Sequence, residues 1–340
     1  MPGKHVKYWI ERNAGQTPVL NKEKNVMDIN AYKPKGSIQN RHLLTLKDYT
    51  PSEIFEVLYT AKQLKKSLKA GEHITDLRHK TLAMIFAKSS TRTRVSFEMG
   101  IRQLGGDGLF LSSNDIQLGR GETIYDTINV LQRYNIDAIM IRTFKQSDVE
   151  DLAKYGNIPI INGLTDLCHP CQVLADMMTV WEHKGDLEGR KLAYFGDGNN
   201  MANSLMVGGA KCGMEVYVAC PEGYEPDKSF YEHASQYGKV VITHDPMEAA
   251  KNADVLYTDV FFSMGQKIEQ AKFDSMMRYQ VNDTVMAAAK PDAIFMHCLP
   301  AHRGEEVTAS VIDSPQSVIF DEAENRLHAQ KGVMYLLMKD

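Results

Sequence analysis

The sequence lacks any apolar run long enough to cross a bilayer, and residues 1–16 lack the apolar centre of a secretory signal. Cysteine is scarce, because the 340 residues include only five, an odd number. A long chain with an odd number of scattered cysteines is not typical of a secreted disulfide framework. We therefore expect a soluble, cytoplasmic protein with reduced thiols and no membrane partner.

An excess of charge of one sign is also lacking. Lys and Arg number 39 against 43 Asp and Glu, which gives a formal net charge of −4 at pH 7. A general nucleic-acid binder needs an extended basic face, so we expect no nucleic-acid partner. The balance still leaves room for one small cationic pocket.

Short apolar runs alternate with amphipathic stretches along most of the chain, which is typical of βαβ units and parallel sheets. The stretch TPSE (50–53) is a capping box that predicts the first helix start. We expect α/β architecture with two doubly wound parallel-sheet domains. The predicted strands are 81–86, 108–112, 137–141, 158–162, 191–195, 215–220, 240–244, 254–258 and 293–297.

Domain boundaries follow from the same alternation. The polar residues 1–40 are expected to form an N-terminal extension. The polar break KGDLEG (184–189) follows a long predicted helix at 170–183 and separates a first domain, 41–183, from a second, 184–320. The last segment, 321–340, is expected to form a helix at about 322–338 that packs back on the first domain.

Polar or reactive side chains follow six of the predicted strands. In an open parallel sheet, ligands bind beyond the carboxyl ends of the strands, so these side chains are expected to face a cleft. The six groups are SSTRT (89–93), Arg142, DLCHPCQ (166–172), GDGNN (196–200), Asp259 with SMGQ (263–266), and Cys298-Leu299-Pro300.

The first of these groups predicts a phosphate site. A helix N-terminus offers free N–H groups to an anion, and Arg92 adds a bidentate fork between the hydroxyl groups of Ser90, Thr91 and Thr93. An ordinary N-cap with surface arginines is the alternative. The motif has neither the glycines nor the lysine of a nucleotide P-loop, which favours a small phosphate compound.

The CHPC stretch (168–171) leaves several interpretations open. A zinc site needs a second paired cluster, which the scattered cysteines do not provide, so no metal is expected. We interpret Cys171 as a small apolar helix residue. His169 stands at a strand end and helix start, with Gln172 one turn on, which favours a ligand role over a structural one. Cys298 could likewise be an inert buried thiol.

The stretch GDGNN (196–200) weakly resembles a dinucleotide-binding turn. Met201 stands where the third glycine of that fingerprint belongs. The two adjacent asparagines could instead hydrogen-bond a carboxylate and an amine. A nicotinamide-dependent dehydrogenase therefore stays only as an alternative function.

Three motifs, SSTRTRVSFE (89–98), HPCQ (169–172) and HCLPA (297–301), in this order and spacing, resemble the aspartate/ornithine carbamoyltransferase family over about residues 40–340. The stretch DVFFSMGQ (259–266), together with HCLPA, is similar to the branch that uses ornithine. The resemblance implies two α/β domains joined by interdomain helices, in a homotrimer or a multiple of trimers. It implies no cofactor and no metal.

The resemblance also implies residue roles. The first domain would bind carbamoyl phosphate and the second L-ornithine, with Gln117 reaching a neighbouring subunit's site. Arg142, His169, Asp259 and Cys298 would be catalytic. Carbamoyl phosphate would contact Ser90, Thr91, Arg92, Thr93, Gln117, Arg142, His169, Gln172, Cys298, Leu299 and Arg326, and ornithine would contact Asn200, Asp259, Ser263 and Met264.

The implied activity is carbamoyl transfer from carbamoyl phosphate to the side-chain amine of L-ornithine, giving L-citrulline and phosphate, or the reverse in arginine breakdown. The aspartate enzyme differs by a proline at the position of Cys298. The putrescine enzyme departs from SMGQ and has an extra C-terminal helix. A non-catalytic binding protein on the same fold is the remaining alternative.

Overall fold

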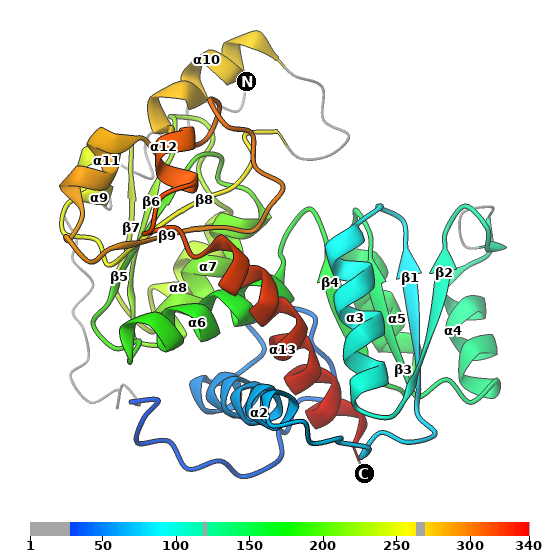
Figure 1. Ribbon diagram of the computed structural model, residues 1–340. Helices are drawn as coiled ribbons and strands as arrows, with labels where there is room; N and C mark the ends of the chain where they lie inside the picture. Colours follow the sequence, from blue (N-terminus) through cyan, green and yellow to red (C-terminus); the bar gives the residue numbers. More distant parts are fainter. Residues whose placement is uncertain (1–27, 118–120, 263–268, 340) are drawn as a thin grey trace.

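The protein is represented by a computed structural model, which describes residues 28–117, 121–262 and 269–339. These residues form two sheets on opposite sides of helix α13 (Ile319–Met338), which is red in Figure 1. The sheets run in the orders β2-β1-β3-β4 and β7-β6-β5-β8-β9, and every pairing between neighbouring strands is parallel. The prediction of two doubly wound parallel sheets is confirmed.

The first sheet places its most apolar strands in the middle. Strands β1 and β3 are buried over almost their whole length, whereas the edge strand β2 alternates between exposed and half-buried residues. The elements of this half are β1 (Thr81–Phe86), α3 (Thr91–Gln103), β2 (Asp107–Ser112), α4 (Ile124–Arg133), β3 (Ala138–Arg142), α5 (Gln146–Tyr155) and β4 (Ile160–Leu164).

The second sheet is built in the same way around β5 and β8, each with buried strand residues. Its strands are β5 (Lys191–Phe195), β6 (Glu215–Ala219), β7 (Val240–Thr243), β8 (Val255–Thr258) and β9 (Ile294–His297). Its helices are α7 (Asn200–Lys211), α8 (Lys228–Ala234), α9 (Pro246–Ala250), α10 (Gln270–Met276), α11 (Asp283–Ala288) and α12 (Ala309–Ile312), with a 3₁₀ turn at Met277–Tyr279.

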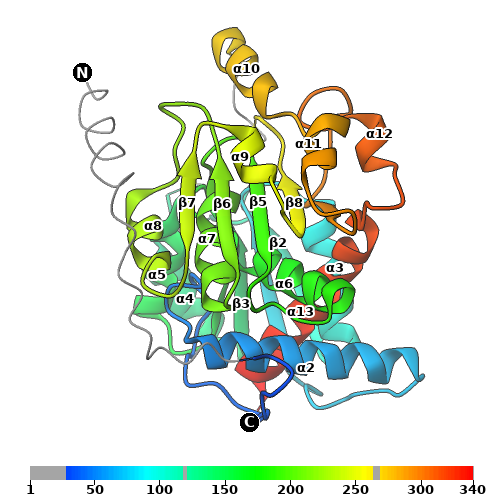
Figure 2. The same cartoon turned by 90° about the vertical axis from the view of Figure 1, so that its left-hand side faces the viewer.

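Three long helices join the two halves. Helix α13 packs on α2 (Pro51–Lys69), α3 and α6 (Pro170–Lys184), and α2 runs below the second sheet in Figure 2. Lys65 of α2 donates to Glu182 of α6 at 2.9 Å and to Asn325 of α13 at 2.8 Å. A Cβ on Gly332 would lie 2.8 Å from the Val57 carbonyl oxygen, so this glycine permits the close approach of α13 to α2.

Helix ends follow the local sequence closely. The capping box at α2 is present, with Thr50 accepting from the Glu53 N–H and the Glu53 carboxylate accepting from the Thr50 N–H. Several boundaries differ slightly from the prediction. Strand β4, for example, begins at Ile160 because Pro159 has no N–H to offer the ladder, and α13 begins at Ile319, one turn earlier than expected.

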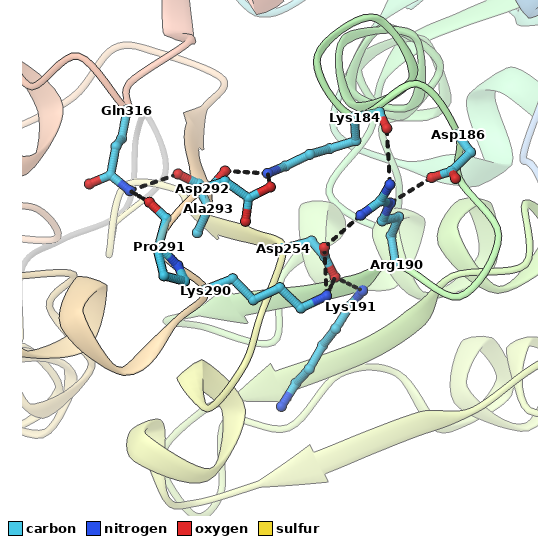
Figure 3. A network of polar contacts seen from close by, with 10 residues as sticks. All are labelled: Lys184, Asp186, Arg190, Lys191, Asp254, Lys290, Pro291, Asp292, Ala293 and Gln316. Carbon is cyan, nitrogen blue, oxygen red and sulfur yellow. Dashed lines mark hydrogen bonds and ion pairs between the residues drawn. The ribbon is translucent and has the colours of Figure 1, made fainter.

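A polar network fastens the end of α6 to the amino ends of β5 and β8 (Figure 3). The buried Asp254 carboxylate accepts from Lys290 at 2.8 Å, from the Lys191 N–H at 2.9 Å and from Arg190 at 3.1 Å. Arg190 also donates to the carbonyl oxygen of Lys184, the last residue of α6, at 3.0 Å. Burial alone would raise the pKa of Asp254, but these hydrogen bonds outweigh it and lower that pKa.

Candidate active site

A cavity of about 620 Å³ opens between the carboxyl ends of the two sheets. One wall comes from residues that follow β1, β3 and β4, and the other from residues that follow β5, β8 and β9, while α13 closes the back. The cavity brings together most of the predicted site residues: Ser90, Arg92, Thr93, Arg142, His169, Gln172, Asn200, Asp259, Cys298, Leu299 and Arg326.

The start of α3 combines an N-cap with a cationic group. Ser90 caps the helix by accepting from the Thr93 N–H at 3.2 Å, and its hydroxyl also donates to the Thr93 hydroxyl at 3.1 Å. Arg92 lines the cavity, whereas Arg94 turns away and lies 3.8 Å over the Phe110 ring. Ser90 can therefore cap the helix while the same segment lines a binding site. Of Arg92 and Arg94, only Arg92 faces the cavity.

Three arginine side chains converge on this wall. Arg142 is the last residue of β3 and is 7% exposed, and its Nε has no hydrogen-bond partner among the described residues. Burial, followed by the charges of Arg326 and Arg92, lowers the pKa of Arg142 to about 10. Arg142 remains cationic at neutral pH, although burial and the nearby arginines destabilise its charged form. A bound anion would offset that destabilisation, as is typical of an anion-binding site.

His169 lies at the N-cap of α6, where its backbone N–H donates to the Ser204 hydroxyl at 2.8 Å. Burial and then the charges of the three arginines lower the pKa of His169 well below its usual value, so the imidazole is neutral. Its Nδ1 has no partner within the part of the chain that the structure describes. A neutral imidazole with an unsatisfied ring nitrogen can hydrogen-bond a ligand without adding charge.

Gln172 links α6 to α13 at the back of the cavity. Its side-chain oxygen accepts from Arg326 Nη1 at 2.5 Å, and Arg326 Nη2 reaches the Thr93 hydroxyl at 3.3 Å. Arg326 is 4% exposed and is thereby held between α6 and α3. The guanidinium faces the same space as Arg92 and Arg142.

The opposite wall is acidic. The Asp259 carboxylate follows β8 and accepts from the Val260 N–H at 2.8 Å, from the Cys298 thiol at 3.1 Å and from the Asn199 amide at 3.3 Å. Burial, and then the charge of Asp259, raises the pKa of the Cys298 thiol well above its usual value. Cys298 is therefore a thiol donor at neutral pH and not a thiolate nucleophile.

The asparagine pair at the start of α7 has divided roles. Asn199 is the N-cap residue and accepts from the Met201 N–H at 2.8 Å. Asn200 instead donates across the cleft to the Thr165 carbonyl oxygen at 2.7 Å. Both side chains line the cavity, and Asn200 is fixed by a contact from the first sheet.

Some predicted residues lie elsewhere. Thr91 and Gln117 are exposed and do not line the cavity, while Ser263 and Met264 lie outside the described residues. Sequence reasoning placed Asp166 and Asp197 in strand-end groups expected to face the cleft but gave them no role, and it did not name Lys88, His302 and Glu305, which also line the cavity. The signal for Lys88 was present, because it follows the end of β1.

The glycine at position 198 argues against a dinucleotide site. A Cβ on Gly198 would lie 2.3 Å from backbone atoms of Glu225 and Pro226, and the Gly198 N–H donates to the Tyr224 carbonyl oxygen at 2.8 Å. The glycine is thus required by the packing of the 224–226 loop. This contact explains the glycine without a bound dinucleotide.

A metal would compete with existing bonds here. Ligand atoms of Asp259, His297 and Cys298 lie within 4.8 Å of one another. However, one nitrogen of His297 contacts Glu306 at 3.2 Å and the other accepts from the Leu299 N–H at 2.9 Å. The thiol of Cys298 is likewise engaged with Asp259.

Comparisons with known proteins agree with this geometry. Residues 41–182 match the family model described as "Aspartate/ornithine carbamoyltransferase, carbamoyl-P binding domain", and residues 188–337 match "Aspartate/ornithine carbamoyltransferase, Asp/Orn binding domain". The chain is 57% identical to the ornithine carbamoyltransferase of Pyrococcus abyssi over 308 residues, covering 89% of this chain and 97% of the relative.

Two further relatives extend the comparison. The Oceanobacillus iheyensis ornithine carbamoyltransferase is 56% identical over 322 residues, covering 93% of this chain and 99% of the relative. The solved structure of the Pyrococcus furiosus ornithine carbamoyltransferase superimposes with a TM-score of 0.86 at 56% identity, covering 89% of this chain and 98% of that one.

Proposed function

The chain belongs to the aspartate/ornithine carbamoyltransferase family, and from this membership we propose that it transfers the carbamoyl group of carbamoyl phosphate to the side-chain amine of L-ornithine. The products are L-citrulline and phosphate. The observation that carries the proposal is the division of the cavity into a wall with Arg92 and Arg142 and a wall with Asp259. The first suits a phosphate and the second an amine.

The phosphate occupies the start of α3. Ser90, Thr91, Arg92 and Thr93 supply hydroxyl and guanidinium donors together with the free N–H groups of the helix end. The exposed Thr91 side chain does not line the cavity, so its part in binding rests on its backbone N–H. Charge-assisted hydrogen bonds of this kind are about twice as strong as neutral ones.

The carbamoyl group lies deeper, against Arg142, His169 and Gln172. When the ornithine amine attacks the carbonyl carbon, a C–N bond forms and negative charge develops on the carbonyl oxygen. The C–O bond to phosphate then breaks, and its electron pair leaves with the phosphate. Arg142 and the neutral His169 are placed to stabilise the oxyanion in a buried site.

Ornithine occupies the acidic wall. Asp259 and Asn200 bind its α-amino and carboxylate groups, together with Ser263 and Met264, and Leu299 lines the reacting centre with Cys298. The attacking amine must be neutral, and the Asp259 carboxylate, which accepts from the Cys298 thiol, is the candidate acceptor for its proton.

Substrate preference tests the proposal directly. Supplied with carbamoyl phosphate and either ornithine, putrescine or aspartate, the protein is expected to turn over ornithine ~10²-fold or more faster in kcat/KM. Putrescine lacks the α-amino acid group and leaves polar groups of the second wall unpaired, at about 1–3 kcal/mol each. Aspartate has that group but no side-chain amine to attack the carbonyl carbon. Colorimetric measurement of the carbamoylated product checks this.

Each other outcome of that assay has a defined meaning. Preference for putrescine or aspartate contradicts the roles of residue 200 and residues 259–264 while leaving the phosphate site in place. No turnover with any amine favours a binding protein on this fold. The direction in cells, towards citrulline or towards carbamoyl phosphate, depends on metabolite concentrations.

The assembly is proposed to be a homotrimer or a multiple of trimers, with Gln117 reaching a neighbouring site. Support comes from a group of exposed apolar residues on α3, β2 and α4: Val95, Met99, Leu109, Tyr125 and Val130. Gln117 is exposed just beyond the edge strand β2. An apolar face of this kind is typical of a protein interface.

Mass measurement in solution checks the assembly. Light scattering is expected to give three times the chain mass of 38.3 kDa, or a multiple of that value. A monomer at micromolar concentration contradicts the proposal. The replacement of Tyr125 by aspartate is expected to shift the mass towards the monomer, because it buries a charge in the interface.

The domain division supports these roles. We propose an extension at 1–40, a carbamoyl phosphate domain at 41–183, an ornithine domain at 184–320 and a C-terminal helical segment at 321–340. A cytoplasmic location is also proposed, with all five cysteines as free thiols. In residues 28–117, 121–262 and 269–339, none of the helices combines the length and apolarity that crossing a bilayer requires.

A further inference from the structure

Behind the cavity, two carboxyl groups are buried against each other with no cation in direct contact among the described residues. Asp176 lies on α6 and Glu322 on α13, and they are 0% and 1% exposed. Both carboxyl groups accept from the same Gln172 amide nitrogen, at 2.7 Å and 2.9 Å, so they lie side by side. Two adjacent carboxylates cannot both stay ionised in such a site, so the pair retains a proton.

The surrounding donors show where that proton belongs. Glu322 accepts from the His297 N–H at 2.8 Å, from the Gln172 amide at 2.9 Å and from the Tyr257 hydroxyl at 3.1 Å. Asp176 Oδ1 accepts from the same Gln172 amide at 2.7 Å. Asp176 Oδ2 is buried, and no described residue donates to it. Donors therefore favour an ionised Glu322, and the proton belongs on Asp176 Oδ2.

This arrangement determines which way Gln172 points. Both carboxyl groups accept from its Nε2, so its Oε1 must face the other way, towards Arg326. The reversed amide would place NH₂ against the Arg326 guanidinium and the amide oxygen against Glu322. Each of those contacts is repulsive, so the pair fixes the amide in one orientation.

Resting on the function proposed above, we propose that Asp176 and Glu322 are positioning residues that share one proton and hold Gln172 and Arg326 in place for carbamoyl phosphate. They touch no substrate themselves, because neither lines the cavity. They also join the halves of the molecule, since Glu322 bonds to β8 and β9 while Arg326 bonds to Thr93 of α3.

The groups that face the pair set the direction of its pH dependence. They are Gln172 from α6, Tyr257 from β8, the His297 N–H and the Cys298 thiol from the end of β9, and Arg326 from α13. Burial is the largest cause that raises the pKa of each carboxyl. Loss of the shared proton at alkaline pH then adds a second buried negative charge behind the cavity, which opposes the binding of the anionic carbamoyl phosphate.

The test uses two isosteric substitutions with opposite expectations. In Asp176→Asn, the amide oxygen still accepts from Gln172 and the NH₂ replaces the shared proton, so the KM for carbamoyl phosphate at neutral pH stays near wild type. In Glu322→Gln, an NH₂ group must meet one of three donors, so that KM rises by about tenfold or more. Glu324→Gln, on the same helix but paired with Lys65 and Lys69, is the matched control.

The pH profile separates positioning from a merely structural role. The ratio of wild-type to Asp176→Asn KM for carbamoyl phosphate, taken at each pH, cancels the titration of the substrates. It is expected to rise above neutral pH, because only the wild type loses the shared proton. A flat ratio, or equal losses in the two variants, overturns the inference. If Glu322→Gln does not fold, the Asp176→Asn ratio alone decides.

Failure of this inference is distinguishable from failure of the proposed function. If the wild-type protein forms citrulline but the two variants behave alike, only the positioning role of Asp176 and Glu322 is contradicted. If the wild-type protein forms no carbamoylated product, the proposed function on which the inference rests is contradicted.

Discussion

The replacement of Arg142 by alanine is expected to lower kcat by about 10²–10³, which corresponds to roughly 2.7–4 kcal/mol of transition-state stabilisation. Arg142 ends the buried strand β3, so its guanidinium is held in place before any substrate arrives. Its Nε has no partner among the described side and main chains. The guanidinium lines the cavity and can therefore stabilise charge that appears during the reaction.

The control for this prediction lies in the same domain. Arg94 is also a cation close to the phosphate motif, but it stacks on Phe110 and pairs with Glu98, away from the cavity. Arg94→Ala is expected to keep wild-type kcat and KM. Arg92→Ala is expected to lose kcat to about the same extent as Arg142→Ala. Steady-state kinetics with ornithine check all three. Near-wild-type turnover in Arg142→Ala would remove its role at the oxyanion.

The replacement of Asp259 by asparagine is expected to reduce kcat/KM for ornithine by about 30-fold to several thousand-fold. This range corresponds to roughly 2–5 kcal/mol, the usual effect of removing one charge from a buried ion pair. Asparagine keeps the shape and one oxygen for the Val260 N–H and the Cys298 thiol, so the loss reports the charge together with one weak hydrogen bond from Asn199. The KM for carbamoyl phosphate should change little, because that ligand lies on the other wall.

Asp313→Asn provides the comparison. This carboxylate pairs with Arg303 on the surface at 2.6 Å, far from the chemistry, and its loss should leave both KM values unchanged. Initial rates with each substrate varied in turn measure the separation. An equal loss of affinity for both substrates in Asp259→Asn would contradict the assignment of Asp259 to ornithine.

Much of the site could be predicted from strand ends. Arg142 and His169 follow apolar runs whose carboxyl ends must meet at the cleft side of a parallel sheet, and both line the cavity. This prediction needs no known structure, because the direction of a parallel strand alone places the residue after it at the carboxyl edge of the sheet. The same rule placed Asp197 at the cleft without giving it a role, and it could have found Lys88, which was not named.

Other features depend on contacts between distant segments. A helical pattern does not reveal that Asp176 meets Glu322, since 146 positions of sequence separate them and α13 starts a turn earlier than its pattern suggested. The different directions of Arg92 and Arg94 depend on the Phe110 ring of another strand. Asn200 likewise uses a carbonyl oxygen of the first sheet, which no local motif encodes.

The hydrogen bonds around Asp254 hold one end of helix α6 in place. Fifteen residues of helix span about 22 Å. One end is bonded to the amino edge of the second sheet through Arg190, and the other carries His169 and Gln172 into the cavity wall. A single helix therefore fixes the distance between that edge and the two cavity residues.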